Sequence, residues 1–148
     1  MNKWIDIALM IGCPSVMVNQ GTRALPEDLA PCVDALKTLS AYGKWKKVAV
    51  IMENRGRTAP EELAQLIRAS GTYANPDIGN FPDEDSRARG LRLLYPLCYN
   101  VIHVKMSPRF DFANAIRISK RMGFKECTRL RLAAPIHTRK CRRYSTRC

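Results

Sequence analysis

Several features that identify a protein quickly are missing from this 148-residue chain. Its apolar runs stay below the roughly 18 residues that a membrane helix needs, so we expect a soluble, cytoplasmic protein without a membrane span. The six cysteines form no C-x-x-C pair, which argues against a zinc knuckle or a redox motif. The chain also has no glycine-rich phosphate loop after a strand, and it has only two histidines, His103 and His137.

The positive charge is concentrated at one end of the chain. Residues 126–148 contain seven Lys or Arg and a single acid, Glu126, and they supply +6 of the net charge of +12. The preceding 125 residues are therefore only mildly basic. A basic tail permits binding to nucleic acid, but Tyr144 is its single aromatic residue and offers little base stacking. We therefore do not expect nucleic acid to be the main partner.

The hydrophobic pattern alternates between strands and helices. Apolar runs predict strands at 15–19, 47–53 and 99–105, with a weaker one at 73–78. Helical spacing, with Gly12, Gly43 and Gly123 as end signals and Thr58 as the N-cap before Pro60, predicts helices at 3–11, 25–42, 60–70, 83–95 and 112–122. Such alternation is typical of parallel βαβ units, so the fold class is α/β.

Three polar side chains stand at or near the carboxyl ends of predicted strands. Glu53 follows VAVIM, Asp77 lies in NPDIGN, and His103 lies in VIHVK. These ends meet at one edge of a parallel sheet, where two carboxylates and an imidazole suit Mn²⁺, Mg²⁺, Co²⁺ or Zn²⁺. Taken singly, each residue also has an ordinary explanation, as a loop acid, a turn residue or a structural histidine.

Four segments together resemble a known family. The strings IMENRG, PEELAQLI, PDIGNFP and LYPLCYNVIHVKM are similar to the core of sugar phosphate isomerases/epimerases of the xylose isomerase-like TIM barrel superfamily. In that family one strand ends in Glu-Asn, the next in Asp-x-Gly-Asn, and the following one carries His-x-Lys. The order and spacing agree here over about residues 3–125.

The resemblance implies a fold and a chemistry. The fold is a partial (β/α)8 TIM barrel of roughly strands four to seven with their helices, over residues 1–125. The chemistry is isomerisation or epimerisation of a sugar or sugar phosphate through an enediolate, with a divalent metal as cofactor. The implied metal ligands are Glu53, Asp77 and His103, with Glu53 also moving a proton, while Lys105, Asn54 and Asn80 contact the substrate or hold the ligands.

The two ends of the chain depart from the family pattern. After Gly123 the family has a strand that ends in a second proton-transferring glutamate, but this chain continues GFKECTRLRLAAPIHT. A reading frame shifted back by one base after Lys125 permits GVYSAE, so we interpret 126–148 as a frameshifted, disordered tail, which the gene sequence tests directly. The first three strands also have no counterpart. We therefore expect a marginally stable chain that forms homo-oligomers and has little or no turnover.

Two other functions remain open. An AP endonuclease-like hydrolase has the same barrel, but such enzymes bind several metals through many histidines and have a histidine where this chain has Asn80. A non-enzymatic protein could instead bind nucleic acid through the basic tail, and the salt dependence of its DNA affinity would reveal this.

Overall fold

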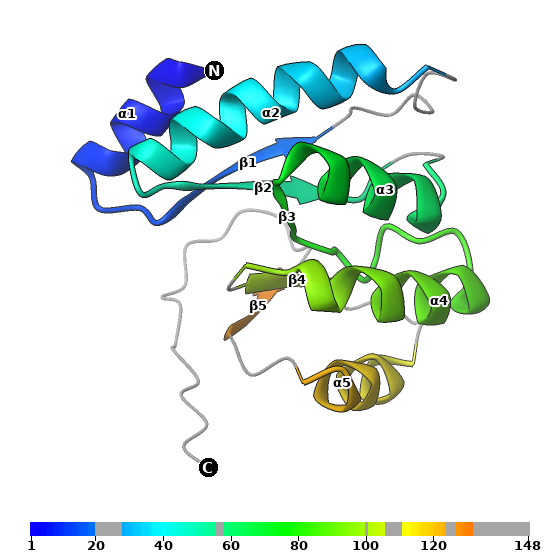
Figure 1. The fold of residues 1–148 in the computed structure, drawn as a ribbon. Coiled ribbons are helices and arrows are strands. Elements are labelled where there is room, and N and C mark those ends of the chain that lie inside the picture. Colours follow the sequence, from blue (N-terminus) through cyan, green and yellow to red (C-terminus); the bar gives the residue numbers. More distant parts are fainter. Residues whose placement is uncertain (20–27, 56–57, 100, 106–110, 124–126, 132–148) are drawn as a thin grey trace.

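A computed structural model of the protein describes residues 1–19, 28–55, 58–99, 101–105, 111–123 and 127–131. Strands and helices alternate along the chain (Figure 1). The elements are α1 (Asn2–Met10), β1 (Ser15–Asn19), α2 (Ala30–Trp45), β2 (Ala49–Glu53), α3 (Pro60–Ser70), β3 (Tyr73–Ala74), α4 (Glu84–Leu94), the 3₁₀ turn η1 (Tyr95–Leu97), β4 (Val101–Lys105), α5 (Phe112–Arg121) and β5 (Cys127–Arg131).

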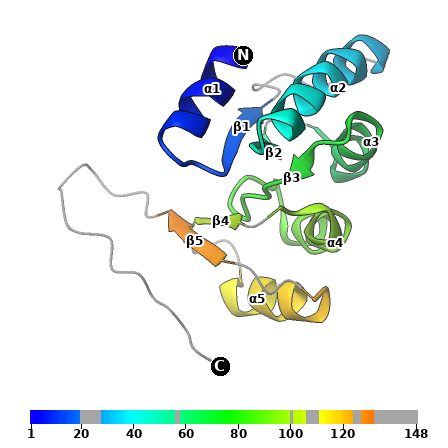
Figure 2. The ribbon, with the colours of Figure 1, turned by 60° about the vertical axis from the view of Figure 1, so that its left-hand side comes forward.

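The described strands pair in parallel. One sheet has the order β1-β2-β3 and the other the order β4-β5. Two isolated parallel bridges, Ala74 to Cys98 and Asp77 to His103, join the sheets. Helices α2 to α5 form an outer layer beside the curved row of strands (Figures 1 and 2). The predicted α/β architecture, a partial barrel of parallel strands with covering helices, is confirmed.

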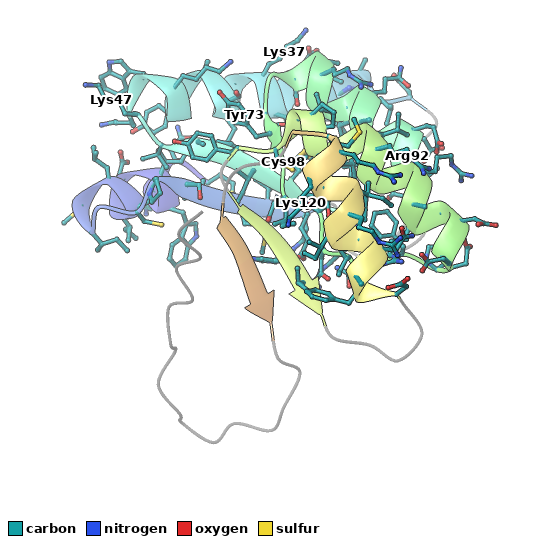
Figure 3. All side chains as sticks on the ribbon, turned by 90° about the horizontal axis from the view of Figure 1, so that it is seen from below. Lys37, Lys47, Tyr73, Arg92, Cys98 and Lys120 are labelled. Atoms are coloured by element: carbon teal, nitrogen blue, oxygen red, sulfur yellow. The ribbon has the colours of Figure 1, made fainter. Side chains whose placement is uncertain are left out.

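The main core lies between the strands and this helix layer. Met52 of β2 and Ile102 and Val104 of β4 pack against apolar side chains of α3, α4 and α5. Each such side chain contributes about 1.5–3 kcal/mol when it is fully buried. Because side chains alternate along a strand, Glu53 and His103 lie on the opposite, inner side of the sheet. Exposed basic residues, such as Lys37, Arg92 and Lys120 in Figure 3, lie on the helices.

Three predicted helix boundaries are wrong. The helix that we expected from residue 25 begins at Ala30, because Leu29 is its N-cap. We expected Gly43 to end α2, but the helix continues to Trp45. A Cβ on Gly43 would lie 2.6 Å from the carbonyl oxygen of Val48, so this glycine permits the close approach of the chain that leads into β2. We expected Thr58 to cap α3, but the N-cap is Ala59, whose N–H donates to the Glu62 carboxylate at 3.3 Å.

The glycines that end α1 and α5 agree with the prediction. Gly12 and Gly123 follow these helices with φ angles of +68° and +74°. This left-handed conformation is the usual one just after a helix, and glycine adopts it without steric cost.

Strand β5 lies beyond residue 125, where we placed the end of the barrel domain. It pairs with β4 in the register Val101 to Cys127 through Lys105 to Arg131. The parallel sheet thus extends into the first residues of the segment that we interpreted as a tail. Residues 132–148 lie outside the described part of the chain.

Helix α1 carries an exposed apolar surface beside the edge strand β1. Trp4 is 62% exposed and Ile11 is 74% exposed, whereas Ile5 and Ala8 pack against α2 and β2. Homo-oligomer formation, which we expected from the exposed edges of a partial barrel, stays a prediction. In the described part of the chain, no helix combines the length and the hydropathy that a membrane span requires.

The close approach at Gly43 predicts a loss of stability for Gly43→Ala. Alanine favours a helix over glycine by about 1 kcal/mol, but the added methyl group meets a backbone oxygen. We expect the free energy of unfolding, measured by urea denaturation, to fall by about 1–3 kcal/mol. Lys37→Ala, an exposed change in the same helix, should stay within about 0.5 kcal/mol of the unmodified protein. A Gly43→Ala protein as stable as the original would contradict this.

Candidate metal centre

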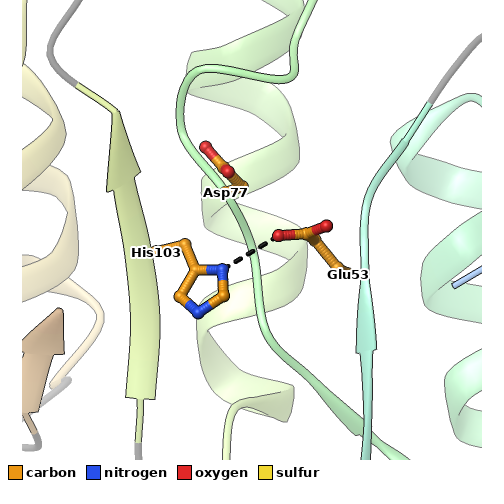
Figure 4. Close-up of side chains that lie close together, drawn as sticks. All are labelled: Glu53, Asp77 and His103. Atoms are coloured by element: carbon orange, nitrogen blue, oxygen red, sulfur yellow. Dashed lines mark hydrogen bonds and ion pairs between the residues drawn. The ribbon is translucent and has the colours of Figure 1, made fainter. Parts of the chain in front are cut away.

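Glu53, Asp77 and His103 lie together on the inner side of the sheet (Figure 4). Glu53 is the last residue of β2, Asp77 follows β3, and His103 is the middle residue of β4. One ligand atom from each side chain lies within 4.8 Å of the other two. Glu53 and Asp77 are fully buried, and the His103 side chain is 13% exposed. The structure thus brings together the three residues that the sequence nominated as metal ligands.

Both oxygens of the Glu53 carboxylate have partners. Oε1 lies 2.9 Å from Nδ1 of His103, and Oε2 accepts a hydrogen bond of 3.0 Å from Nε of Arg55. Burial raises the pKa of Glu53, but the hydrogen bonds from His103 and Arg55 outweigh it and hold the pKa below its ordinary value. Glu53 is therefore ionised, and Nδ1 of His103 carries the hydrogen that it donates to Oε1.

The backbone on either side of Asp77 bonds to both sheets. Toward β2, the N–H of Asn75 donates to the carbonyl oxygen of Met52 at 2.7 Å. Toward β4, the N–H of His103 donates to Pro76 at 3.0 Å, and the N–H of Ile78 donates to the carbonyl oxygen of His103 at 3.1 Å. The segment 75–78 therefore fixes Asp77 between the strands that carry Glu53 and His103.

The buried side chain of Asn54 adds a second attachment. Its Oδ1 accepts from the N–H of Asp77 at 2.7 Å, and its Nδ2 donates to the Asp77 carbonyl oxygen at 3.2 Å. Asn80 donates in turn to the carbonyl oxygen of Asn54 at 3.0 Å, and Gly79 N–H donates to Oδ1 of Asp77 at 2.9 Å. Both asparagines thus hold the backbone of the site, which is one of the roles we predicted. Their contact with a substrate stays a prediction.

Lys105 and Arg55 each lie two positions after a proposed ligand. Lys105 is the last residue of β4, two positions after His103, and its side chain lies outside the described part of the structure. Arg55 was missed, although it follows the Glu-Asn pair directly. No sequence signal distinguishes an arginine that turns back to its neighbour from a solvated loop arginine.

The donor set fits a divalent metal ion. Two carboxylates and an imidazole are hard to borderline ligands, which suit Mg²⁺, Mn²⁺, Co²⁺ or Zn²⁺. Two ligands bound about 2.1 Å from one ion lie at most about 4.2 Å apart. Ligands bound at right angles to each other lie about 3.0 Å apart, so separations of up to 4.8 Å have to close by about 1–2 Å when one ion binds all three side chains.

The described cysteines do not provide a competing site. Cys13, Cys32 and Cys98 are all free thiols. Burial raises the pKa of the Cys98 thiol to about 12, which keeps it protonated at neutral pH. A thiolate nucleophile is therefore not available at Cys98.

Comparison with solved structures identifies the class of fold. A xylose isomerase domain protein from Planctomyces limnophilus matches with a TM-score of 0.69 and 17% identity, covering 90% of this chain and 56% of that chain. A xylose isomerase-like TIM barrel protein from Mycobacterium smegmatis, in complex with magnesium, gives a TM-score of 0.68, 14% identity and coverages of 87% and 57%. A xylose isomerase domain containing protein from Salmonella typhimurium LT2 matches with a TM-score of 0.62 and 12% identity, covering 88% of this chain and 58% of that chain.

These matches show that the chain has the fold of xylose isomerase-like TIM barrel proteins. It spans somewhat more than half the length of each of the three, in agreement with a partial barrel. No family model matches the chain, and a search of curated proteins finds no relative.

The bonds of Asn54 predict that Asn54→Ala destabilises the protein. The change leaves the buried N–H of Asp77 without its acceptor, which costs about 1–3 kcal/mol of unfolding free energy. Chemical denaturation measures this loss. Asn2→Ala, which removes an exposed amide at the start of α1, serves as the control and should change stability by less than about 0.5 kcal/mol. Equal stabilities for the two variants would show that Asn54 does not hold the site.

Proposed function

We propose that this protein binds a divalent metal ion through Glu53, Asp77 and His103 and is a sugar or sugar phosphate isomerase/epimerase-like protein. The observation that carries the proposal is the convergence of these three side chains toward the carboxyl end of the parallel strands, from the last residue of β2, the segment after β3 and the middle of β4. In barrels of this kind, that end is where active sites lie. The fold shared with xylose isomerase domain proteins and the magnesium complex of one of them support the same assignment.

The metal would polarise the carbonyl and hydroxyl oxygens of a bound sugar and thereby lower the cost of forming an enediolate. Asp77 and His103 would hold the ion on one side of the site, and their own positions are fixed by the backbone of residues 75–78. Glu53 is ionised, so its carboxylate has the capacity to accept the proton from the carbon next to the carbonyl group. Lys105, Asn54 and Asn80 remain the proposed contacts for substrate oxygens.

Strand β5, which pairs with β4, lacks a residue that turnover would need. The sequence of β5, Cys127–Arg131, contains no Asp or Glu. The family resemblance expects a second proton-transferring glutamate in that region. In isomerisation a proton leaves one carbon and returns to its neighbour, and in epimerisation it returns to the opposite face of the same carbon, so either reaction needs a group that gives the proton back. We therefore propose that metal binding is intact in this chain while isomerase turnover is weak or lost.

Calorimetric titration with Mn²⁺ and Mg²⁺ tests the metal site without depending on turnover. We expect one ion per chain, and Glu53→Gln, Asp77→Asn and His103→Ala should each weaken binding at least tenfold, because each removes one ligand. Glu61→Gln, which neutralises an exposed carboxylate on α3 that pairs with Arg89, is the matched control.

The control variant should bind as the unmodified protein does. Equal affinities for all four variants and the unmodified protein would place the ion elsewhere and would overturn the proposal. Failure to bind either ion at millimolar concentration would do the same.

A further inference from the structure

Arg55 makes a charged contact with Glu53 from outside the proposed ligand set. Its Nε donates to Oε2 of Glu53 at 3.0 Å, and its side chain is 38% exposed while that of Glu53 is fully buried. The two residues are separated by Asn54 alone, so the arginine turns back from the loop that follows β2. The guanidinium thus lies at the solvent side of a buried carboxylate.

This contact and metal binding make competing demands on the same carboxylate. Oε1 of Glu53 accepts a hydrogen bond from His103, and Oε2 accepts one from Arg55. The guanidinium of Arg55 is always cationic. A metal ligand bond forms at about 2.0–2.2 Å and uses a carboxylate lone pair. An arginine does not lose its charge in proteins, so it must share Glu53 with the ion or move away from it.

We infer that Arg55 is a positioning residue that competes with the divalent ion for Glu53. In the absence of metal, the guanidinium compensates the buried negative charge and keeps the carboxylate ordered. When the ion binds, Arg55 gives up or weakens its bond to Oε2 and swings toward solvent, where its side chain is already partly exposed. The metal affinity of this protein is therefore lower than its three ligands alone would give.

This inference rests on the proposed metal site. It also predicts whether removing Arg55 strengthens or weakens metal binding, which the site alone does not. A residue that merely supports Glu53 would, when removed, leave the ligand disordered and weaken metal binding. A competing cation would, when removed, strengthen it. The sign of the change in affinity distinguishes the two roles.

The test measures the dissociation constant of Mn²⁺ by calorimetry for the full chain and for Arg55→Met, which keeps the length of the side chain and removes its charge. Replacing a charge-assisted hydrogen bond predicts roughly tenfold tighter binding. Arg55→Lys retains the charge and should stay within about threefold of the unmodified protein. Arg89→Met removes the same charge from an exposed pair with Glu61 on the helix layer and should leave the affinity unchanged.

The outcomes separate this inference from the proposal on which it rests. If the unmodified protein binds Mn²⁺ and Arg55→Met binds it equally or more weakly, the competition is overturned while the metal site stands. If neither protein binds Mn²⁺, both are overturned. Thermal unfolding of each variant verifies that it is folded, and Arg55→Gln replaces Arg55→Met if the methionine variant does not fold.

Discussion

The site depends on the way in which four residues, 75–78, join two separate sheets. Strand β3 is only two residues long, and no continuous ladder connects it to β4. The connection consists of isolated bridges, of which the one between Asp77 and His103 lies at the site itself. The side chain of Asn54, which follows β2, bonds to the N–H and the carbonyl oxygen of Asp77. In a longer pair of strands, backbone groups would have made these hydrogen bonds. Asp77 is thereby fixed between Glu53 and His103 without belonging to a regular strand.

This arrangement concentrates polar groups in a place where they are costly to bury. Four polar residues here are at most 5% exposed: Glu53, Asn54, Asn75 and Asp77. A polar group buried this deeply without a hydrogen-bond partner costs more free energy than a hydrogen bond normally contributes. Arg55 compensates the charge of Glu53, and His103 forms a hydrogen bond with the same carboxylate. A buried carboxylate such as Glu53, which a cationic neighbour stabilises, also attracts a divalent cation. The same electrostatic requirement therefore accounts for the internal contacts and for the proposed ligand.

The sequence was a good guide to the elements and to the three central residues. Continuous apolar runs predicted β2 and β4. Glu53, Asp77 and His103 were expected near the carboxyl ends of strands that run in the same direction, and the parallel pairing of these segments does bring the three residues together. Periodicity does not report close approaches between distant residues, so the continuation of α2 through Gly43 toward Val48 was missed. Asn54 forms two hydrogen bonds with the Asp77 backbone, and Arg55 forms one with Glu53. Both contacts depend on side-chain direction, which no local sequence pattern encodes. Strand β5 was missed because its CTRLR sequence is basic and weakly apolar, and its pairing depends on the free edge of β4.

The most direct measurement is a crystal structure of the protein soaked in Mn²⁺, with diffraction data collected at a wavelength where manganese scatters anomalously. We expect one strong anomalous peak bonded to Glu53, Asp77 and His103. The guanidinium of Arg55 should lie farther from Glu53 than its present 3.0 Å. Anomalous density at another group of side chains, or an intact hydrogen-bonded Glu53–His103 pair at saturating Mn²⁺, would contradict it.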